Sequence, residues 1–523
     1  MNNNTKLLIM FVLVIGIFFF YSQFNTPAPP PEEPAVSAED TTAPDSSEIS
    51  EGRIADEVME ENISKTEIIS SDTSTIEFET DFIKGSISTL SGGFTDIVLK
   101  EYKSNGDSTL HIIPKGKPAM TISVKNDRGV FTCDNDNYTV VYEGNLNPVI
   151  REDSLVLQLE TDSIIIRRTY IFRDSSYLIG HKITSNRAWN EVIYSMPEGI
   201  NVTEENIKDD LGYFAVNAFS NENLIRKKHK ETKDTIALTG DYEWMGLQSK
   251  YFFTGIIADG SGFEAYGKDD GRIGAKFYIE DSRISFYTGP IDYEILSQYD
   301  NGMDKLVNFG WSWITPISKV ILKILSGIHS IVPNYGFVIM TFAFLFILIF
   351  SPLTFKSYYS MRKMQMIQPK INELKKKYEK DPQKLNQETM KLYKDNNVNP
   401  FTGCLPLFIQ MPVFFALYAI LRTTIELRGA PFIFWIQDLS AKDPYFILPI
   451  LTGLTMFVSQ KFSATDNSQK MLIYTMPVIM TVFFLNFPSG IVIYWFTYNL
   501  LSIVQQYIIR KRINNQTAEA QNE

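Results

Sequence analysis

The chain has 523 residues and a formal net charge of −11, so it is longer than one ordinary domain. The charge is unevenly divided. Residues 23–316 hold 49 acidic and 27 basic side chains, whereas the rest of the chain holds 11 acidic and 22 basic. The acidic part disfavours nucleic acid as the main partner, and no DNA partner is expected. The two parts are therefore expected to work in different surroundings.

Residues 1–26 predict a membrane anchor. The apolar run "LLIMFVLVIGIFFFY" follows Lys6, and no small-residue cleavage pattern follows it. We therefore expect an uncleaved transmembrane signal-anchor rather than a signal peptide that is removed. Residues 27–75 are rich in Pro, Ser, Thr, Glu and Asp, which predicts a disordered linker that gives the next domain reach.

Residues 76–305 change to a period of two, which predicts an all-β sandwich with its own core. "LVLQLE", for example, alternates Leu155, Leu157 and Leu159. The whole chain has four histidines and no HExxH, GxSxG or P-loop pattern, so we expect neither an enzyme nor a cofactor. Its two cysteines, Cys133 and Cys404, fall in different parts, so neither a disulfide nor a cysteine metal site is expected.

Residues 306–335 predict an amphipathic helix that lies flat on the outer membrane surface. The apolar residues recur at helical spacing and three basic residues take the other side. The apolar set is Ile317, Val320, Ile321, Ile324, Ile328 and Ile331, and the basic set is Lys319, Lys323 and His329. The alternative is an ordinary helix that caps the β-domain.

Five further apolar runs predict membrane spans between residues 336 and 512, which gives six with the anchor. Positive residues near span ends stay in the cytoplasm. The loop from Thr354 to Cys404 holds eleven basic and five acidic residues, and Arg510, Lys511 and Arg512 follow the last span. We therefore expect a multi-pass membrane protein with cytoplasmic N- and C-termini, a cytoplasmic tail at 513–523, and residues 23–316 on the outer side of the membrane.

The basic loop predicts a cytoplasmic helical hairpin at 356–399, with its turn at Asp381–Pro382. Its charges suit contact with ribosomal RNA, anionic lipid or a nascent chain, although a solvated loop explains them equally well. Three methionines, Met361, Met364 and Met366, would form either an adaptable apolar surface or the hairpin core.

Three stretches resemble the core of the YidC family of membrane-protein insertases: "NPFTGCLPLFIQMPVFFALY", "ELRGAPFIFWIQDLSAKDPYFILPIL" and "FFLNFPSGIVIYWFTYNLLSIVQQ". The resemblance covers roughly residues 310–512, and the exported β-domain is similar to the Gram-negative form. It implies a five-helix insertase core around a hydrophilic groove, a periplasmic β-super-sandwich, and nascent membrane proteins as clients. It also implies work alone or beside the Sec translocon, as a folding chaperone as well as an insertase.

The resemblance also gives a role to polar residues inside apolar runs. Gln410 lies between two prolines in "LPLFIQMPVFFALYAIL", where a dry bilayer would penalise its amide. We expect it to line a water-holding groove. Further candidates for the lining are Thr341, Ser489, Tyr494 and Asn499. For each, the alternative is a helix-to-helix hydrogen bond that holds the bundle together.

One position departs from the family pattern. The family usually carries a cation midway along its first core helix, and alignment places Ile347 there, with no charge between Gly336 and Phe355. Arg422, toward the outer end of its span, is considered as a replacement for the missing cation, but snorkelling to the membrane interface is a simpler role for it. We therefore expect hydration by neutral groups and weaker handling of clients with acidic tails.

Two other functions stay open from the sequence. A secondary transporter would also hold polar groups at midplane, but the chain shows neither an internal repeat nor an intramembrane acid–base pair. An envelope scaffold would use its spans as an anchor and its β-domain to bind a sugar or a partner. Polar groups buried in the core favour insertion over mere anchoring.

Overall fold

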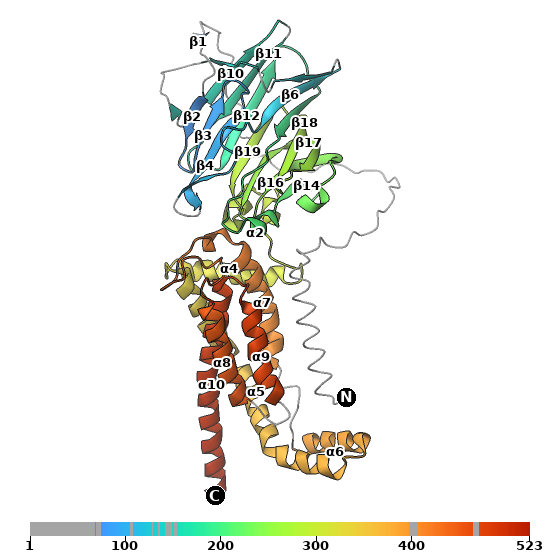
Figure 1. Ribbon diagram of the computed structural model, residues 1–523, viewed down its shortest axis with the longest axis vertical. Coiled ribbons are helices and arrows are strands. Elements are labelled where there is room, and N and C mark those ends of the chain that lie inside the picture. The colour runs from blue at the N-terminus through green and yellow to red at the C-terminus, as the bar shows by residue number, and fades with distance from the viewer. Residues whose placement is uncertain are drawn as a thin grey trace, which may run out of the picture. The chain divides into compact units, whose positions relative to one another are not determined.

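The computed structural model describes residues 68–69, 75–104, 108–127, 129–133, 136–141, 149–150, 154–162, 164–396, 405–463 and 470–522. The predicted anchor at 1–26 and almost all of the predicted linker at 27–75 lie outside these residues. The chain divides into two compact units, one of residues 28–305 and one that contains residues 306–523. Each unit has its own secondary structure, β in the first and α in the second (Figure 1).

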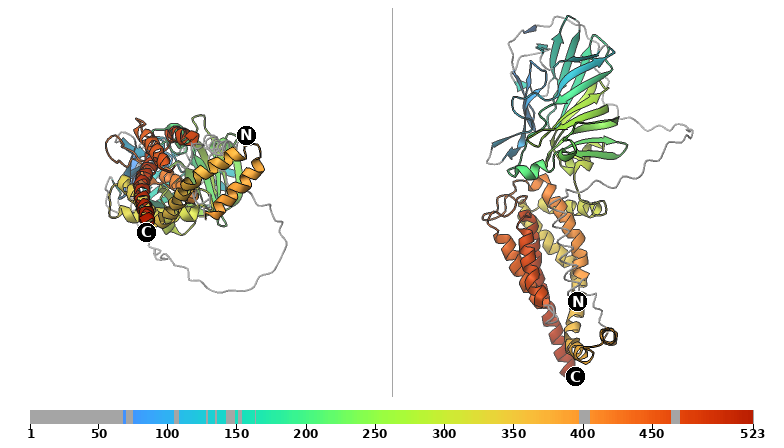
Figure 2. Two further views of the ribbon diagram at one scale, coloured as in Figure 1. Left: turned by 90° about the horizontal axis from the view of Figure 1, so that it is seen from below. Right: turned by 45° about the vertical axis from the view of Figure 1, so that its right-hand side comes forward.

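The first unit is a β-sandwich, as the alternating sequence predicts, and Figure 2 shows its two sheets as separate layers. The smaller sheet has the order β5(Ser108–His111), β4(Phe94–Ser104), β3(Ile83–Ser88), β2(Thr75–Glu79), β9(Val149–Ile150). The main path of the larger sheet is β1(Ile68–Ile69), β8(Thr139–Val141), β10(Ser154–Glu160), β11(Ile165–Ile171), β12(Leu178–Ser185), β19(Arg283–Pro290), β17(Phe252–Gly267), β18(Ile273–Ile279), β13(Glu191–Met196), β6(Thr121–Asn126), β7(Gly129–Thr132). A side branch adds β14(Ala215–Ser220), β15(Asn223–Lys228) and β16(Ile236–Gln248), with β16 paired to β17.

Aromatic rings from both sheets form the sandwich core. Phe78 of β2 stacks on Phe172, just after β11, with ring centroids 4.4 Å apart. Phe94 of β4 meets Phe286 of β19 edge to face at 5.6 Å, within the favourable range for aromatic pairs. The predicted alternation on β10 is confirmed, because Leu155, Leu157 and Leu159 are all buried and their neighbours are not. The sandwich therefore closes as the period-two pattern predicts.

A buried cation lies in this core. Arg168 of β11 is fully buried and donates to His181 Nε2 at 3.2 Å and to the carbonyl of Met120 at 2.9 Å. Its guanidinium also lies 5.3 Å from the ring centre of Tyr170. Burial, together with the charge of Arg168, holds the pKa of His181 well below its usual value. His181 is therefore neutral at physiological pH, and the charge in this cluster belongs to Arg168.

The second unit is helical. Its helices are α4(Thr315–His329), α5(Tyr335–Lys377), α6(Pro382–Asp395), α7(Leu405–Thr423), α8(Ile447–Ser463), α9(Lys470–Phe484) and α10(Ser489–Asn522). Most of these helices run side by side, whereas α4 and α6 lie across the direction of the others (Figure 1). Among the described residues, α5 is the one helix that is both long and apolar enough to cross a membrane. Shorter apolar helical stretches are Phe408–Thr423, Ile447–Phe462 and Tyr474–Phe484. The count of six spans remains a prediction.

Helix α5 is longer than the sequence suggests. The pattern predicts a span that ends near residue 350 and a separate hairpin from 356, but one helix of 43 residues covers both. Pro352 lies inside it and lacks the N–H that a helix interior uses. The hydroxyl of Thr354 bonds the nearby carbonyls of Phe350 and Ser351 at 3.2 and 3.0 Å. The helix continues through this proline, which membrane helices tolerate where neighbouring groups satisfy the freed backbone carbonyl.

The end of α5 packs on α6 as a hairpin. Ile367 and Ile371 are buried between them, and Met364, Leu392 and Tyr393 pack against this pair. The turn is built by Asp381, whose carboxylate accepts the N–H of Lys384 and caps α6 before Pro382. Met364 thus contributes to the hairpin core, whereas Met366 is 60% exposed. The core role is therefore confirmed for Met364, and the adaptable surface stays a prediction.

Helix α4 has two apolar faces rather than one. Ile321, Leu322 and Leu325 are buried, and the helix packs against α5 and α7. Val320 and Ile324 are exposed, as is Ile331 just beyond its end. The first face joins α4 to the bundle, and the described residues leave the second face uncovered.

Candidate functional site: a polar seam inside an apolar helical bundle

The centre of the site is a hydrogen bond between α7 and α10. Gln410 is 3% exposed, and its Nε2 donates to the hydroxyl of Tyr494 at 2.7 Å. Tyr494 is fully buried, with its ring centre 6.0 Å from that of Phe342 on α5. Helical spacing turns both polar side chains inward, so one amide and one phenol meet where three apolar helices converge.

Several buried polar atoms of the bundle lack a partner. Among the described residues, six buried side-chain nitrogen or oxygen atoms have no hydrogen bond, and five of them lie in α7, α8 and α10. The five are Gln410 Oε1, Thr452 Oγ1, Gln460 Oε1, Thr497 Oγ1 and Asn499 Nδ2. Buried polar groups in proteins are nearly always paired with protein or water, because an unpaired one costs about 1–3 kcal/mol. The bundle therefore holds a concentration of groups that water would satisfy.

A second set of polar contacts joins α10 to α5 and α8 further along α10. Gln506 Nε2 donates to Tyr358 of α5 and to Ser459 of α8, both at 2.9 Å. Gln505 Nε2 donates to Thr354 of α5, also at 2.9 Å. These residues were not predicted from the sequence. The signal was available, because two adjacent glutamines interrupt the apolar run of the last span.

The same bonds fix the register of α8 against α10. The loop before α8 bonds the start of α10, since Ser489 N donates to the carbonyl of Ala441 at 2.7 Å. Both helices therefore start at the same end and run parallel. Thr452 and Asn499 each lie seven residues, about two turns, before the bonded pair Ser459–Gln506. This spacing places two of the unpaired polar groups at one level of the same interface.

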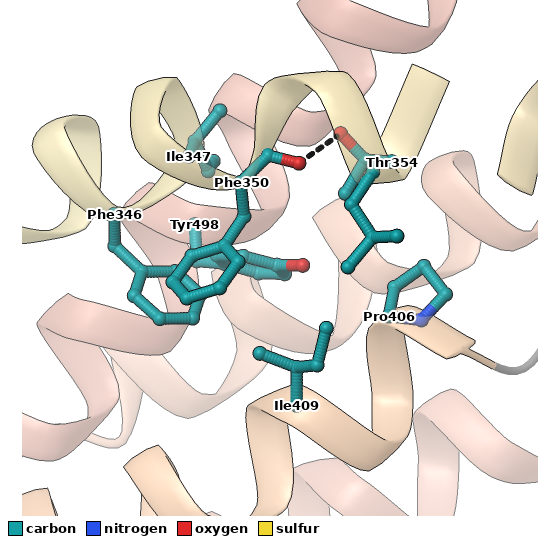
Figure 3. Close-up of a pocket in the computed structure, with 8 residues that line it drawn as sticks. Phe346, Ile347, Phe350, Thr354, Pro406, Ile409 and Tyr498 are labelled. Atoms are coloured by element: carbon teal, nitrogen blue, oxygen red, sulfur yellow. Dashed lines mark hydrogen bonds between the residues drawn. The ribbon is translucent and has the colours of Figure 1, made fainter. Parts of the chain in front are cut away.

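A recess between α5 and α7 contains the position of the missing cation (Figure 3). It has about 290 Å³ of empty space, including open solvent, and no charged side chain lines it. Its lining is Phe346, Ile347, Phe350, Leu353, Thr354, Pro406, Ile409 and Tyr498. Ile347 is half-buried, and the ring centres of Phe346 and Phe350 beside it are 4.6 Å apart. The local surface at this position is apolar.

The structure brings together two of the predicted lining residues, Gln410 and Tyr494. Asn499 follows Tyr494 on α10 and is buried, with its Nδ2 unpaired. Thr341 is half-buried on α5, next to the Phe342 that contacts Tyr494. Ser489 differs, because its hydroxyl donates to the carbonyl of Ala441 at 2.9 Å and fastens the loop to the start of α10. The helix-to-helix alternative describes its bond better than a groove wall does.

Arg422 makes its contacts at the last turn of α7. Its guanidinium carbon lies 5.6 Å from the ring centre of Tyr418, one turn earlier, and its Nη1 also donates to the hydroxyl of that tyrosine. The residue is half-buried. This local cation–π pair accounts for the position of the charge without a role in the recess.

An apolar helical bundle with a polar interior, joined to a separate β-sandwich, is the architecture of a membrane protein with a large water-soluble domain. Residues 327–516 match the family model of the 60Kd inner membrane protein, and residues 75–324 match that of the YidC periplasmic domain. The chain therefore belongs to the YidC family, in the form that carries a periplasmic domain.

Named relatives agree with the family models. The chain is 33% identical to the membrane protein insertase YidC of Citrifermentans bemidjiense, over 84% of this chain and 86% of that protein. It is 32% identical to the membrane protein insertase YidC of Mannheimia succiniciproducens, over 97% of both proteins. A solved structure of an active YidC insertase is similar at 20% identity and a TM-score of 0.40, over 84% of this chain and 94% of that one.

Proposed function

We propose that this chain is a membrane-protein insertase and folding chaperone that moves nascent transmembrane segments from the cytoplasm into the inner membrane. The observation that carries the proposal is the concentration of unpaired buried polar atoms in α7, α8 and α10. A helix bundle that served only as an anchor would gain stability from apolar groups at those positions. The family to which the chain belongs supports the same function.

Water along this seam gives the chemical reason for insertion. A client segment must carry polar groups through hydrocarbon, and a charge at the centre of a helix costs about 2.5–3.5 kcal/mol on insertion scales. Gln410 and Tyr494 offer both hydrogen-bond donors and acceptors to water or to a client amide. A hydrated wall beside lipid lowers the barrier for the polar groups while the apolar face of the client enters the bilayer. The chain requires neither a cofactor nor a bond-breaking step for this work.

The positive-inside rule supports the proposed orientation. The helical hairpin and Arg510, Lys511 and Arg512 lie in the cytoplasm, with both termini, whereas residues 23–316 lie in the periplasm. The exposed apolar face of α4 then rests on the periplasmic membrane surface, where two exposed tryptophans, Trp311 and Trp313, precede it. Six spans satisfy this arrangement.

The recess at Ile347 sets a client preference in this proposal. Its lining supports apolar or neutral side chains in the first part of a client to cross, because no cation is present to attract a carboxylate. Clients with strongly acidic exported tails are handled less well. The helical hairpin and the basic tail contact the ribosome, anionic lipid or nascent chain, and the Sec translocon is a partner for part of the clients.

Site-specific crosslinking tests the function directly. A photoreactive residue replaces Gln410 in one sample and Phe408, which is 69% exposed on the same helix, in a matched control. Ribosome-bound chains with a first transmembrane segment are then irradiated in vesicles that contain the protein. We expect adducts from position 410 that exceed those from 408.

The opposite outcome is also defined. Absence of adducts at 410, together with unchanged client insertion when Gln410, Tyr494 and Asn499 are replaced by leucine, would contradict an insertase groove at this site. Uptake of a small solute by the purified protein would favour a transporter instead.

A further inference from the structure

The loop that joins α7 to α8 displays bare aromatic side chains. Phe434 is 82% exposed and Tyr445 is 65% exposed, with Ile433 and Phe446 at 39% and 40%. The stretch "APFIFWIQ" at residues 430–437 contains no charged residue. A contiguous exposed apolar patch of this kind usually marks a surface that another apolar phase covers.

The loop is held in place, so this exposure is built into the fold. Asp443 is 1% exposed, and its carboxylate accepts from Trp435 Nε1 at 2.9 Å and from the N–H of Leu448 at 2.7 Å. The N–H of Phe432 bonds the carbonyl of Ile436 at 2.9 Å and closes a turn around Phe434. The aromatic side chain therefore projects from a fastened turn.

Two aromatic residues of this loop have left-handed backbones. Phe434 has φ of 57° and Phe446 has φ of 58°, a region that glycine enters freely and bulky residues disfavour. Glycine or asparagine would fit the same turn with less strain. A large, exposed aromatic residue at a position of this kind points to a role for its side chain outside the fold of the chain.

The patch is continuous with the outward apolar surface of the bundle. Tyr445 and Phe446 directly precede α8, on which Ile450 and Leu454 are exposed at 59% and 58%. On its other side, the ring of Phe432 packs at 5.2 Å on Phe337, an exposed residue in the first turn of α5. The apolar phase that covers the outward faces of the helices therefore also borders the loop.

We propose that the turn at residues 433–436 inserts Phe434 into the acyl-chain boundary of the periplasmic leaflet, with Tyr445 and Phe446 beside it at headgroup level. Aromatic residues favour this depth because one side of the ring meets hydrocarbon and the other meets polar headgroups. The turn fixes the height of the bundle in the bilayer on the side opposite the hairpin. The proposal rests on the membrane placement given under the proposed function.

Spin-label accessibility in lipid vesicles tests the insertion. Three proteins that each carry one added cysteine are labelled, at Phe434, at Gln437 or at Ile450, with Cys404 replaced by serine in all of them. A sample without an added cysteine measures any labelling of Cys133, which is buried. Gln437 is exposed on the same turn and serves as the matched control. Ile450 reports on the placement of α8 itself.

We expect the ratio of oxygen to nickel-chelate accessibility to be high at 450, clearly raised at 434, and low at 437. A high ratio at 450 with equal, water-like values at 434 and 437 would overturn this proposal alone. A water-like value at 450 would overturn the membrane placement from which it starts. Protection of 434 from both reagents would show cover by a second protein copy and would also overturn it. A Phe434→Gly protein that unfolds in detergent at an equal or higher temperature than the parent shows that the fold does not need this side chain.

Discussion

Replacement of the Gln410–Tyr494 pair by apolar residues would show whether the interior of the bundle is dry or hydrated, because the two cases predict opposite changes in stability. The double variant Gln410→Leu/Tyr494→Phe removes the 2.7 Å hydrogen bond and the unpaired oxygen Gln410 Oε1 together. A polar bond between membrane helices is worth about 0.6 kcal/mol on average. An unpaired polar atom in dry surroundings costs about 1–3 kcal/mol. The two effects have opposite directions.

In a dry interior, the double variant would therefore be more stable than the parent by about 0.4–2.4 kcal/mol, because relief of the unpaired oxygen exceeds the lost bond. In a hydrated interior, water already satisfies that oxygen, so the variant loses about 0.6 kcal/mol. We expect the second result, accompanied by slower client insertion. Unfolding by denaturant in bicelles measures the stability, and reconstituted vesicles with a neutral-tailed client measure the insertion.

The two single variants complete a double-mutant cycle that isolates the pair. A stabilised double variant that inserts its client at the parental rate would refute a wet groove at Gln410. A destabilised variant with parental insertion would leave the pair as a structural bond between helices and would equally remove its role in the mechanism.

Three further predictions concern other parts of the molecule. Ile347→Arg should raise the insertion of an acidic-tailed client relative to a neutral-tailed one, even though a central charge costs about 2.5–3.5 kcal/mol on insertion scales. Ile347→Leu is the control. An unchanged ratio between the two clients would contradict the proposed client preference. Burial lowers the pKa of His181 in the folded domain, so the unfolded chain binds a proton at pH values where the folded domain does not. The free energy of unfolding therefore decreases as the pH falls below the ordinary histidine pKa. Between about pH 7.5 and 5.5 this loss amounts to about 1 kcal/mol, measured by hydrogen exchange of β11 and β12, and a His181→Gln protein with the same slope would disprove the cause. In α8, a Cβ at Gly453 would lie 2.0 Å from Thr481 Oγ1 of α9, so Gly453→Ala should destabilise the bundle by about 1–3 kcal/mol in thermal or denaturant unfolding. Addition of Thr481→Ala should restore most of that loss, and a failure to do so would place the strain elsewhere.

The sequence predicted the parts of the fold that local periodicity specifies. Alternation along "LVLQLE" predicted a half-buried strand, and Asp381–Pro382 predicted a helix start, because each depends on neighbouring residues alone. It did not predict that α5 continues through Pro352, since that depends on whether neighbouring groups satisfy the carbonyl that proline frees. Nor did it predict the partner of Ser489, which depends on the path of a loop 48 residues away in the chain.

The site shows the same division. Gln410 stood out because an amide in an apolar run is locally anomalous, but its partner Tyr494 lies 84 residues further on and only packing makes the pair. The Gln506 network was missed because glutamines near the end of a span are also compatible with the membrane boundary. How distant helices pack against each other decides between a network and a boundary position for such glutamines, and a single sequence does not show that packing.

The unbroken course of α5 has a mechanical consequence. One hydrogen-bonded rod carries Ile347 of the recess and Ile367 and Ile371 of the helical hairpin. A force applied to the hairpin would thus reach the recess through the backbone of one helix, with no loop between the two. The prolines at 352 and 369 are the two points where such a load would bend the rod.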